Sequence, residues 1–175
     1  SKLQEEGGAD LLSWPWCEPI HIKKSSLICV DNCRHQTSTA RKVETVAHDL
    51  DLGDRLQFIE GDAFELFRDR FDDESIDCFW LDFGVGDRIA DFVRGLWPAI
   101  SPGGFVLVHS SVTNRGTRVW LDAVRRNEPE SVTGVPPGEA HHISFLEPHK
   151  HFQNAITVLQ KRPPGFAEPL YSERA

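Results

Sequence analysis

Short apolar runs, separated by amphipathic segments, constrain the fold of this chain more than any other feature of its sequence. The runs lie at residues 26–30, 56–59, 76–81 and 105–108, and each is rich in strand-forming residues. A strand that is apolar on both faces belongs inside a sheet that helices cover on both sides. The sequence therefore predicts a doubly wound α/β fold, in which these runs are parallel strands joined by right-handed crossovers.

The segment after the first run predicts the first crossover helix. It spans residues 37–50, and its apolar stripe recurs every three or four positions, at Ala40, Val43, Ala47 and Leu50. Gly53 follows and is placed as the stop signal of this helix.

Later segments predict the remaining elements. Helices are expected over residues 64–70 and 115–126, and a tight turn over residues 101–104. A helical face after the third run is formed by Ile89, Phe92, Val93 and Leu96. The helix at residues 115–126 is expected to turn one side inward, with Val119, Trp120 and Val124.

The C-terminal part changes character. Residues 142–146 and 155–159 are interpreted as an antiparallel strand pair, which makes the sheet mixed. We expect one domain over residues 25–162, preceded by an irregular segment (1–24) and followed by a tail (163–175). One domain with a hydrophobic core suits a chain of 175 residues.

Charge and hydropathy argue against two classes of partner. The net charge is −8 and no stretch concentrates Lys or Arg, so we expect no nucleic acid partner. No apolar run approaches the ~20 residues that span a bilayer, so we expect no membrane partner. The expectation is a soluble cytoplasmic protein, with a targeting segment upstream of Ser1 left open. Cys29 and Cys78 lie in predicted buried strands and are interpreted as ordinary thiols.

Acidic residues follow three of the four runs. Asp31, Asp62 and Asp82 stand at or just beyond a carboxyl end, the edge at which open α/β sheets bind ligands. An ionised carboxylate such as Asp31 can accept hydrogen bonds from two ribose hydroxyls. Asp62 is placed to accept from an adenine amine, beside the Ala63 amide. The alternative is that these acids cap helices or lie in turns.

The stretch from residue 25 to residue 111 resembles the core of class I S-adenosylmethionine (SAM) dependent methyltransferases, especially small-molecule O-methyltransferases. LICVD looks like the family's second strand with its ribose acid, and GDRLQFIEGDAFELF is similar to its third strand and adenine-contacting loop. FDDESIDCFWLD looks like the fourth strand, and LWPAISPGGFVLVHSS resembles the helix, turn and fifth strand that follow. The resemblance implies a Rossmann-like sheet.

The resemblance also implies a function and a cofactor site. The implied reaction is in-line methyl transfer from SAM to an oxygen, or less readily a nitrogen, of a small-molecule acceptor, with S-adenosylhomocysteine (SAH) as product. Asp31 would bind the ribose, and Asp82 would lie near the sulfonium and the acceptor. The implied cofactor contacts are Asp31, Gly61, Asp62, Ala63, Asp82 and Phe83.

His109 ends a core strand at the ligand edge of the predicted sheet. Imidazole exchanges protons near neutral pH, so His109 is a candidate general base, and Asp82 is the second candidate catalytic residue. A structural histidine is the alternative interpretation. We expect no catalytic metal, because residues 109–111 read His-Ser-Ser where metal-dependent members carry an Asp-Asn pair.

The sequence departs from the family upstream of Leu27. The glycine-rich loop that lets backbone amides approach the methionine end of SAM is not recognisable, and neither is the first strand, which is central in the family's sheet. Residues 9–16 could fill that slot, upstream sequence could be missing, or a partner chain or second copy could complete the sheet. The alternative function is a methyltransferase-like domain that no longer catalyses and serves as a binding module or assembly subunit.

A competing register takes residues 80–87, WLDFGVGD, as the family's first strand and glycine-rich loop. The next strand would then end in His109 rather than an acid, and too few strands would remain downstream. The run also lacks the third glycine of a dinucleotide fingerprint and the catalytic loop of a kinase. A histidine cluster could hold a metal but is interpreted as solvated loop residues: His141, His142, His149 and His151.

Overall fold

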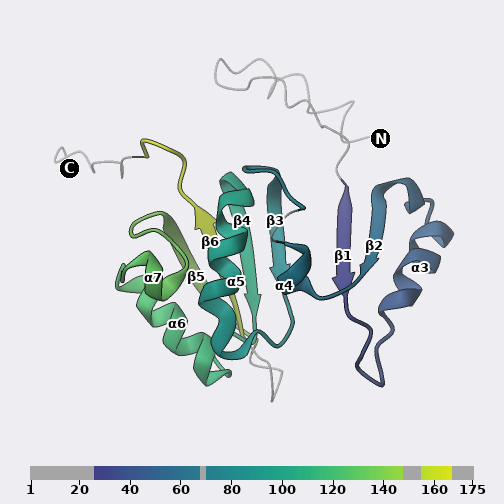
Figure 1. Cartoon of the computed structure of the whole chain (residues 1–175), viewed down its shortest axis with the longest axis horizontal. Coiled ribbons are helices and arrows are strands. Elements are labelled where there is room, and N and C mark those ends of the chain that lie inside the picture. The colour runs from purple at the N-terminus through teal and green to yellow at the C-terminus, as the bar shows by residue number, and fades with distance from the viewer. Residues whose placement is uncertain (1–25, 68–69, 148–154, 167–175) are drawn as a thin grey trace, which may run out of the picture. The chain divides into compact units, whose positions relative to one another are not determined.

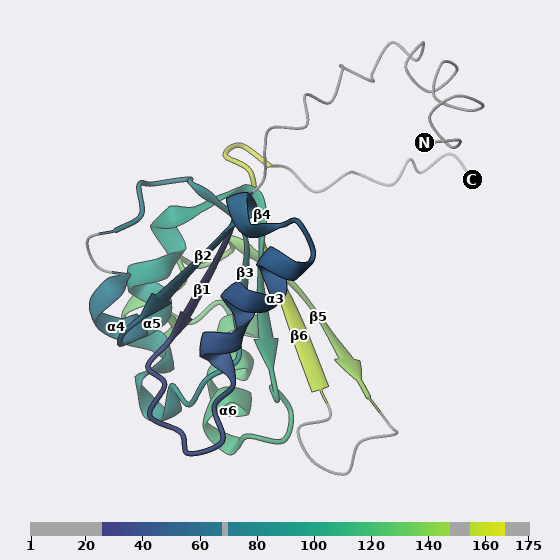
Figure 2. The ribbon, with the colours of Figure 1, turned by 90° about the vertical axis from the view of Figure 1, so that its right-hand side faces the viewer.

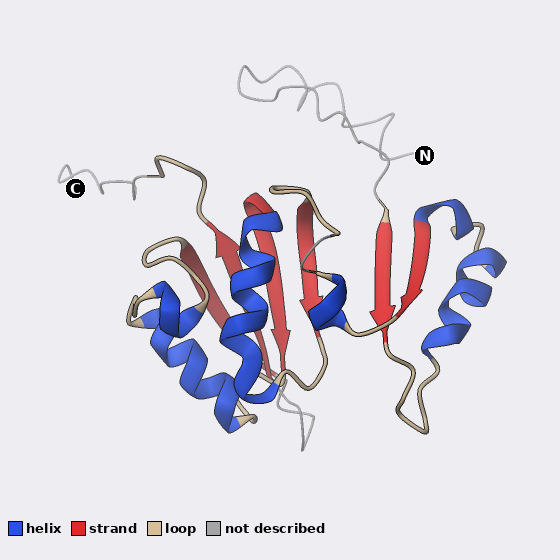
Figure 3. Ribbon diagram, in the orientation of Figure 1, coloured by secondary structure: helices blue, strands red, loops and turns tan. Residues whose placement is uncertain are grey.

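The computed structural model describes residues 26–67, 70–147 and 155–166. The chain divides into two compact units, residues 1–63 and 64–175, and each is considered by itself below. Strands and helices alternate along the described chain, as Figure 3 shows in red and blue. The mixed α/β architecture, with parallel strand pairs and a C-terminal antiparallel pair, confirms the predicted fold class.

The first unit contains a parallel strand pair. β1 (Leu27–Asp31) pairs with β2 (Leu56–Glu60), and the two carboxyl ends lie in register, with Asp31 opposite Glu60. The crossover between them contains a 3-10 turn, η1 (Ala40–Lys42), the helix α3 (Val43–Asp49) and a second 3-10 turn, η2 (Gly53–Arg55). Figure 1 shows α3 beside β2.

The crossover helix is shorter than the predicted span of residues 37–50. Helical structure begins only at Ala40. Before it, the His35 ring accepts a hydrogen bond from the Thr37 amide, and the Ser38 hydroxyl accepts one from the Ala40 amide, both at 3.3 Å. Such local side-chain bonds offer the backbone an alternative to helix, which explains the late start.

The predicted stop at Gly53 is wrong, because the helix ends earlier and on a different residue. Asp51 adopts the left-handed conformation, with φ of 56°. The Leu52 amide donates to the Ala47 carbonyl at 2.8 Å, and the Asp51 amide donates to the His48 carbonyl at 3.1 Å. This pair of bonds is the Schellman arrangement, in which an aspartate takes the position that glycine usually occupies. Gly53 instead opens η2.

The first unit is less buried than predicted. β1 is half-buried, and Leu27 at its start is 57% exposed. Of the predicted helix stripe only Ala47 is buried, and Leu50 is 63% exposed. Among the described residues of this unit, α3 is the one α-helix that packs on the strand pair, so one face of β1 lacks the cover that its apolar sequence suggested.

The second unit contains a four-stranded sheet in the order β3-β4-β6-β5. β3 and β4 are parallel, whereas β6 is antiparallel to both of its neighbours. The strands span Ile76–Leu81 (β3), Ile100–His109 (β4), Ala140–Leu146 (β5) and Ala155–Lys161 (β6). The predicted third strand and terminal strand pair are thereby confirmed.

Helices of the second unit lie on one face of this sheet, as Figure 1 shows for α5, α6 and α7 and Figure 2 shows again for α5 and α6. They span Ile89–Leu96 (α5), Arg115–Arg125 (α6) and Glu130–Thr133 (α7). Shorter helical pieces are α4 (Ala63–Leu66), η3 (Gly86–Arg88) and η4 (Trp97–Ala99). α4 is shorter than the helix predicted over residues 64–70.

The core lies between the helices and one face of the sheet. α5 buries the face predicted for it: Ile89, Phe92, Val93 and Leu96. On the sheet, Val106 and Leu159 are paired neighbours and are fully buried. α6 buries Trp120 and Val124 as predicted, but Val119 is 60% exposed and the prediction for that residue is wrong.

The opposite sheet face stays partly open. Paired register places Trp80, Leu107, Val158 and Ile143 in one row across this face. Trp80 is 52% exposed and Ile143 is 54% exposed. Cys78 shares the face with Trp80 and is exposed, so its predicted burial is wrong. The sequence pattern implied cover on both faces, whereas the described helices of this unit cover one.

Residues 101–104, predicted as a tight turn, are part of β4. The pairing jumps from Ile76 opposite Ile100 to Cys78 opposite Phe105, so the four residues form an irregularity within the strand. A Cβ on Gly104 would lie 2.8 Å from the Ser101 carbonyl oxygen. This close approach explains the need for glycine, and the turn-like composition marks a bulge.

α6 begins with a side-chain cap that can be tested. The Asn114 side chain accepts a hydrogen bond from the Thr117 amide at 3.1 Å, and Asn114 has extended backbone. Replacing Asn114 by alanine is expected to lower the free energy of unfolding by about 1 kcal/mol, because one helix amide loses its acceptor. Urea unfolding measures this loss. Asn114→Asp keeps the acceptor and should retain most of the stability; an equal loss in both variants would contradict the cap.

Candidate functional site

The carboxyl ends of β3 and β4 lie side by side. Their parallel register places Leu81 opposite Val108. The next residues along each strand are Asp82 and His109, so the register brings both candidate catalytic residues to the same edge of the sheet. This edge is where open α/β sheets bind ligands.

Asp82 and His109 are hydrogen-bonded to each other. His109 Nδ1 lies 2.7 Å from Asp82 Oδ1. The histidine side chain is 13% exposed and the aspartate side chain is 53% exposed. An ionised carboxylate can only accept, so Nδ1 is the donor of this hydrogen bond. In the neutral form of the ring, Nε2 would then carry the lone pair that can accept a proton.

A cavity of about 320 Å³ opens beside this pair. Its lining comes from the loop at residues 82–86, the ends of β3 and β4, and the first residues of α6. Phe83, a predicted cofactor contact, lies in this lining and is 40% exposed. Gly86 has φ of 53°, a conformation that suits glycine. The cavity is large enough for part of a small ligand.

Buried hydroxyls anchor the chain just beyond His109. Ser111 is fully buried, and its Oγ accepts a hydrogen bond from Thr157 Oγ1 at 2.8 Å. Thr157 Oγ1 also lies 2.7 Å from Ser144 Oγ, which links the anchor to β5. The intervening Ser110 has φ of 55°. This hydrogen-bond network was not predicted from the sequence. The feature that could have indicated it is Thr157, a polar residue within the otherwise apolar run of β6.

The remaining predicted site residues lie at the carboxyl ends of β1 and β2. Asp31 Oδ1 accepts a hydrogen bond from the Cys33 amide at 2.6 Å, and Oδ2 has no hydrogen-bond partner among the described residues. The Gly61 amide donates to the Asp31 carbonyl at 3.1 Å, which joins the two strand ends. Asp62 is half-buried, and Ala63 begins α4. Asp31 therefore retains an oxygen that can accept from a hydroxyl.

Histidine, cysteine and carboxylate side chains were also predicted to be free of metal, and their arrangement is described only in part. No cluster of three or more His, Cys, Asp or Glu side chains there could hold a metal ion. His149 and His151 lie outside the described residues. Burial raises the pKa of the Cys29 thiol, which keeps it protonated as a small apolar group. No helix among the described residues is both long and apolar enough to cross a membrane.

Comparisons with known proteins add a family and a fold. A family model described as a methyltransferase domain matches residues 15–111. The structure is similar to a methyltransferase from Geobacter sulfurreducens, with 16% identity and a TM-score of 0.58 over 79% of this chain and 59% of that one. A comparison with curated proteins gives no match.

Two further solved structures carry bound ligands. An O-methyltransferase from Bacillus cereus in complex with SAH matches at 10% identity and a TM-score of 0.58, over 78% of this chain and 63% of that one. TomG, an O-methyltransferase of tomaymycin synthesis from Streptomyces achromogenes in complex with SAM, matches at 13% identity and a TM-score of 0.58, over 78% and 62%. This chain thus spans about three fifths of their length, and at these identities the likeness shows the fold.

Proposed function

The chain belongs to the methyltransferase domain family, and from this premise we propose that it transfers a methyl group from SAM to an oxygen of a small-molecule acceptor. The observation that carries the proposal is the 2.7 Å hydrogen bond between His109 and Asp82 beside a cavity at the ligand edge of parallel strands. Nitrogen is the second acceptor atom that this arrangement can serve. SAH is the co-product.

The residues at the strand ends suit the chemistry of SAM. Asp31 offers a carboxylate oxygen to the ribose hydroxyls, and Asp62 with the Ala63 amide would face the adenine. Phe83 and the loop at residues 84–86 line the cavity next to Asp82 without large polar side chains. Bound SAM would supply an electrophilic methyl group on its sulfonium.

His109 supplies the proton acceptor in this proposal. Nε2 removes the proton from the acceptor hydroxyl as the oxygen becomes a nucleophile. The imidazolium that forms keeps its Nδ1 hydrogen bond to Asp82, whose negative charge balances it. The buried pair Ser111 and Thr157 holds the end of β4, so His109 is positioned before the acceptor binds.

A domain that binds a ligand without catalysis is the second candidate. Residues 1–26 contain no recognisable glycine-rich loop, the loop that holds the methionine end of SAM in the family, so the residues named above account for the nucleoside end alone. Both candidates share the nucleoside half of the site. They differ in turnover, so binding and methyl transfer must be measured separately.

Cofactor binding depends on Asp31 if the proposal holds. Calorimetric titration with SAH is expected to show one saturable site, and Asp31→Ala to weaken it by about 10- to 100-fold, because charge-assisted hydrogen bonds to the ribose are lost. Asp49→Ala, on a side chain that is 71% exposed on α3, is the matched control and should bind normally. Absence of heat would contradict the cofactor assignment, whereas unchanged affinity in Asp31→Ala would contradict the ribose contact alone.

A further inference from the structure

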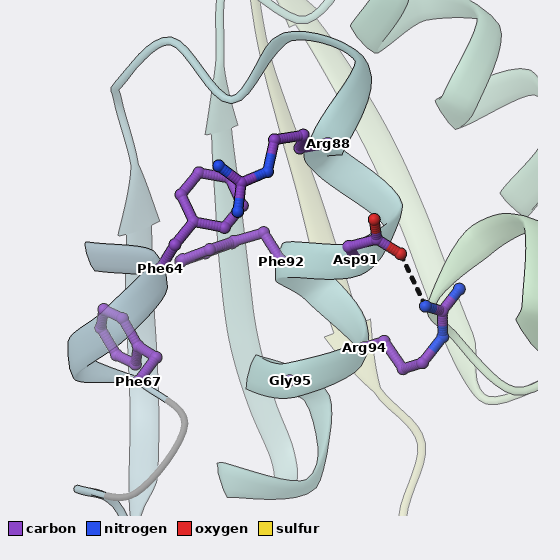
Figure 4. A pocket seen from close by; sticks show the side chains of 7 residues that line it. All are labelled: Phe64, Phe67, Arg88, Asp91, Phe92, Arg94 and Gly95. Atoms are coloured by element: carbon purple, nitrogen blue, oxygen red, sulfur yellow. Dashed lines mark hydrogen bonds and ion pairs between the residues drawn. The ribbon is translucent and has the colours of Figure 1, made fainter. Parts of the chain in front are cut away.

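A second cavity of about 320 Å³ lies between α4 and α5 (Figure 4). None of its lining residues lines the cavity beside His109 and Asp82. Its lining comes from Arg88 at the end of η3, from α5, and from the phenylalanines of the α4 segment. The proposed methyl transfer does not use these side chains, so we consider separately what the second cavity could bind.

The floor of this second cavity is aromatic. Phe92 packs edge-on against Phe64 at 5.1 Å and against Phe67 at 5.5 Å between ring centroids. Phe92 is 3% exposed and anchors the cluster in the core. Phe64 and Phe67 are half-buried, and Arg88 lies over the Phe64 ring while Phe71 stacks on the Phe67 ring at 4.9 Å between centroids. The floor is therefore apolar, and it suits an apolar ring that packs edge-on.

The rim carries one unbalanced positive charge. The Arg88 guanidinium lies 3.7 Å above the centroid of the Phe64 ring, as Figure 4 shows. No ion pair or side-chain hydrogen bond to Arg88 occurs among the described residues, so its N–H groups stay available. Arg94, by contrast, donates to Asp91 Oδ1 at 2.7 Å and to the Ser131 carbonyl at 2.9 Å. Arg88 is therefore the group that an anion would meet.

Gly95 lines the second cavity at its exposed side, called the mouth below. It lies on the exposed side of α5, within the helix, where glycine costs about 1 kcal/mol relative to alanine. A Cβ at this position would meet nothing within 4 Å, so packing within the protein does not require glycine. A larger side chain at position 95 would occupy space beside the aromatic floor.

We propose that the second cavity binds a small aromatic carboxylate. The ring would lie on the phenylalanine floor, and the planar carboxylate would accept two parallel hydrogen bonds from the Arg88 guanidinium. Phe83, which lines the cavity at the catalytic pair, packs edge-on against Phe92 of the second cavity at 5.1 Å between ring centroids, so the linings of the two cavities are in contact. The proposal does not depend on methyl transfer.

The test is calorimetric titration of the chain with 2-naphthoate, beside the neutral amide 2-naphthamide. One saturable site for 2-naphthoate is expected, with affinity at least 10-fold above that of the amide. Arg88→Gln should lower the affinity for 2-naphthoate at least 10-fold and leave the amide unchanged. Arg118→Gln, an exposed arginine on α6 outside the cavity, is the control and should bind as the unaltered chain does.

A second variant separates the contribution of the cavity's free space from that of the Arg88 charge. Gly95→Leu should abolish binding of both probes by filling the mouth, while the thermal unfolding midpoint stays or rises because leucine favours helix. Three results would overturn the proposal: no binding of 2-naphthoate to the unaltered chain, equal affinity in Arg88→Gln, or undiminished binding in Gly95→Leu.

Discussion

Replacing His109 by glutamine is expected to lower the rate of methyl transfer by about 10²- to 10⁴-fold while leaving the affinity for SAH unchanged. Glutamine is a neutral polar side chain of similar length, but its amide cannot take up a proton. The variant therefore removes proton acceptance and keeps a polar side chain at this position. Initial rates with SAM and an accepted hydroxylated substrate measure the effect.

Two further observations make the His109→Gln result specific to proton transfer. Added imidazole should restore part of the rate, because it can enter the open cavity and accept the proton. His48→Gln replaces a histidine that is 89% exposed on α3 and should behave as the unaltered chain. A rate in His109→Gln within about threefold of normal, where general bases contribute about 10²-fold or more, would contradict the assigned role.

Replacing Gly134 by alanine is expected to lower the free energy of unfolding by about 3–5 kcal/mol. Gly134 ends α7 with φ of 73°, which strains any residue that has a Cβ. The added Cβ would also lie 2.2 Å from the Ala90 carbonyl oxygen and 2.7 Å from the Arg94 amide nitrogen. Both atoms belong to the backbone of α5, so α7 must move away from α5 to admit it.

Gly138→Ala is the matched control for the Gly134 prediction. Gly138 has φ of 80°, yet a Cβ there would meet nothing within 4 Å. Only backbone strain applies, so the loss should be about 1–2 kcal/mol. Urea unfolding of both variants compares strain alone with strain plus a clash. Equal losses would show that α7 and α5 do not pack as closely as the structure has them.

Local patterns in the sequence were sufficient for much of the fold. The α5 face was predicted residue by residue, because its apolar positions recur with helical period and the whole set packs on the sheet. β3 and the β5–β6 pair were predicted because each strand is a short run rich in strand-forming residues and flanked by turn residues. In each case the signal lies within one element.

The errors concern what covers an element and how it ends. Val119 and Cys78 are apolar and fit the local pattern, yet both are exposed because the described neighbouring helices leave their faces open. Gly53 was predicted to end the first crossover helix because it is a glycine, whereas the backbone hydrogen bonds show that Asp51 takes the left-handed position at the end of α3. The spacing of residues in the sequence does not indicate which neighbouring elements cover a helix or strand, or which residue ends a helix.

The candidate site was predicted as separate residues and not as a pair. Asp82 and His109 each stood out because they end apolar runs. Their hydrogen bond depends on the register of β3 and β4, and the irregularity at residues 101–104 sets that register. Residue spacing along the sequence does not indicate this register. The hydroxyl contact between Ser111 and Thr157 joins residues 46 positions apart and was equally out of reach.

Methyl transfer by this chain is tested most directly by following the methyl group itself. The chain is incubated with SAM that carries a deuterated methyl group and a panel of small hydroxylated compounds, and the products are analysed by mass spectrometry and NMR. We expect a deuterated methyl ether on an acceptor oxygen, one SAH released per ether formed, and loss of both in His109→Gln. Saturable SAH binding without a labelled product from any acceptor would contradict the proposed function and identify a domain that binds without catalysing.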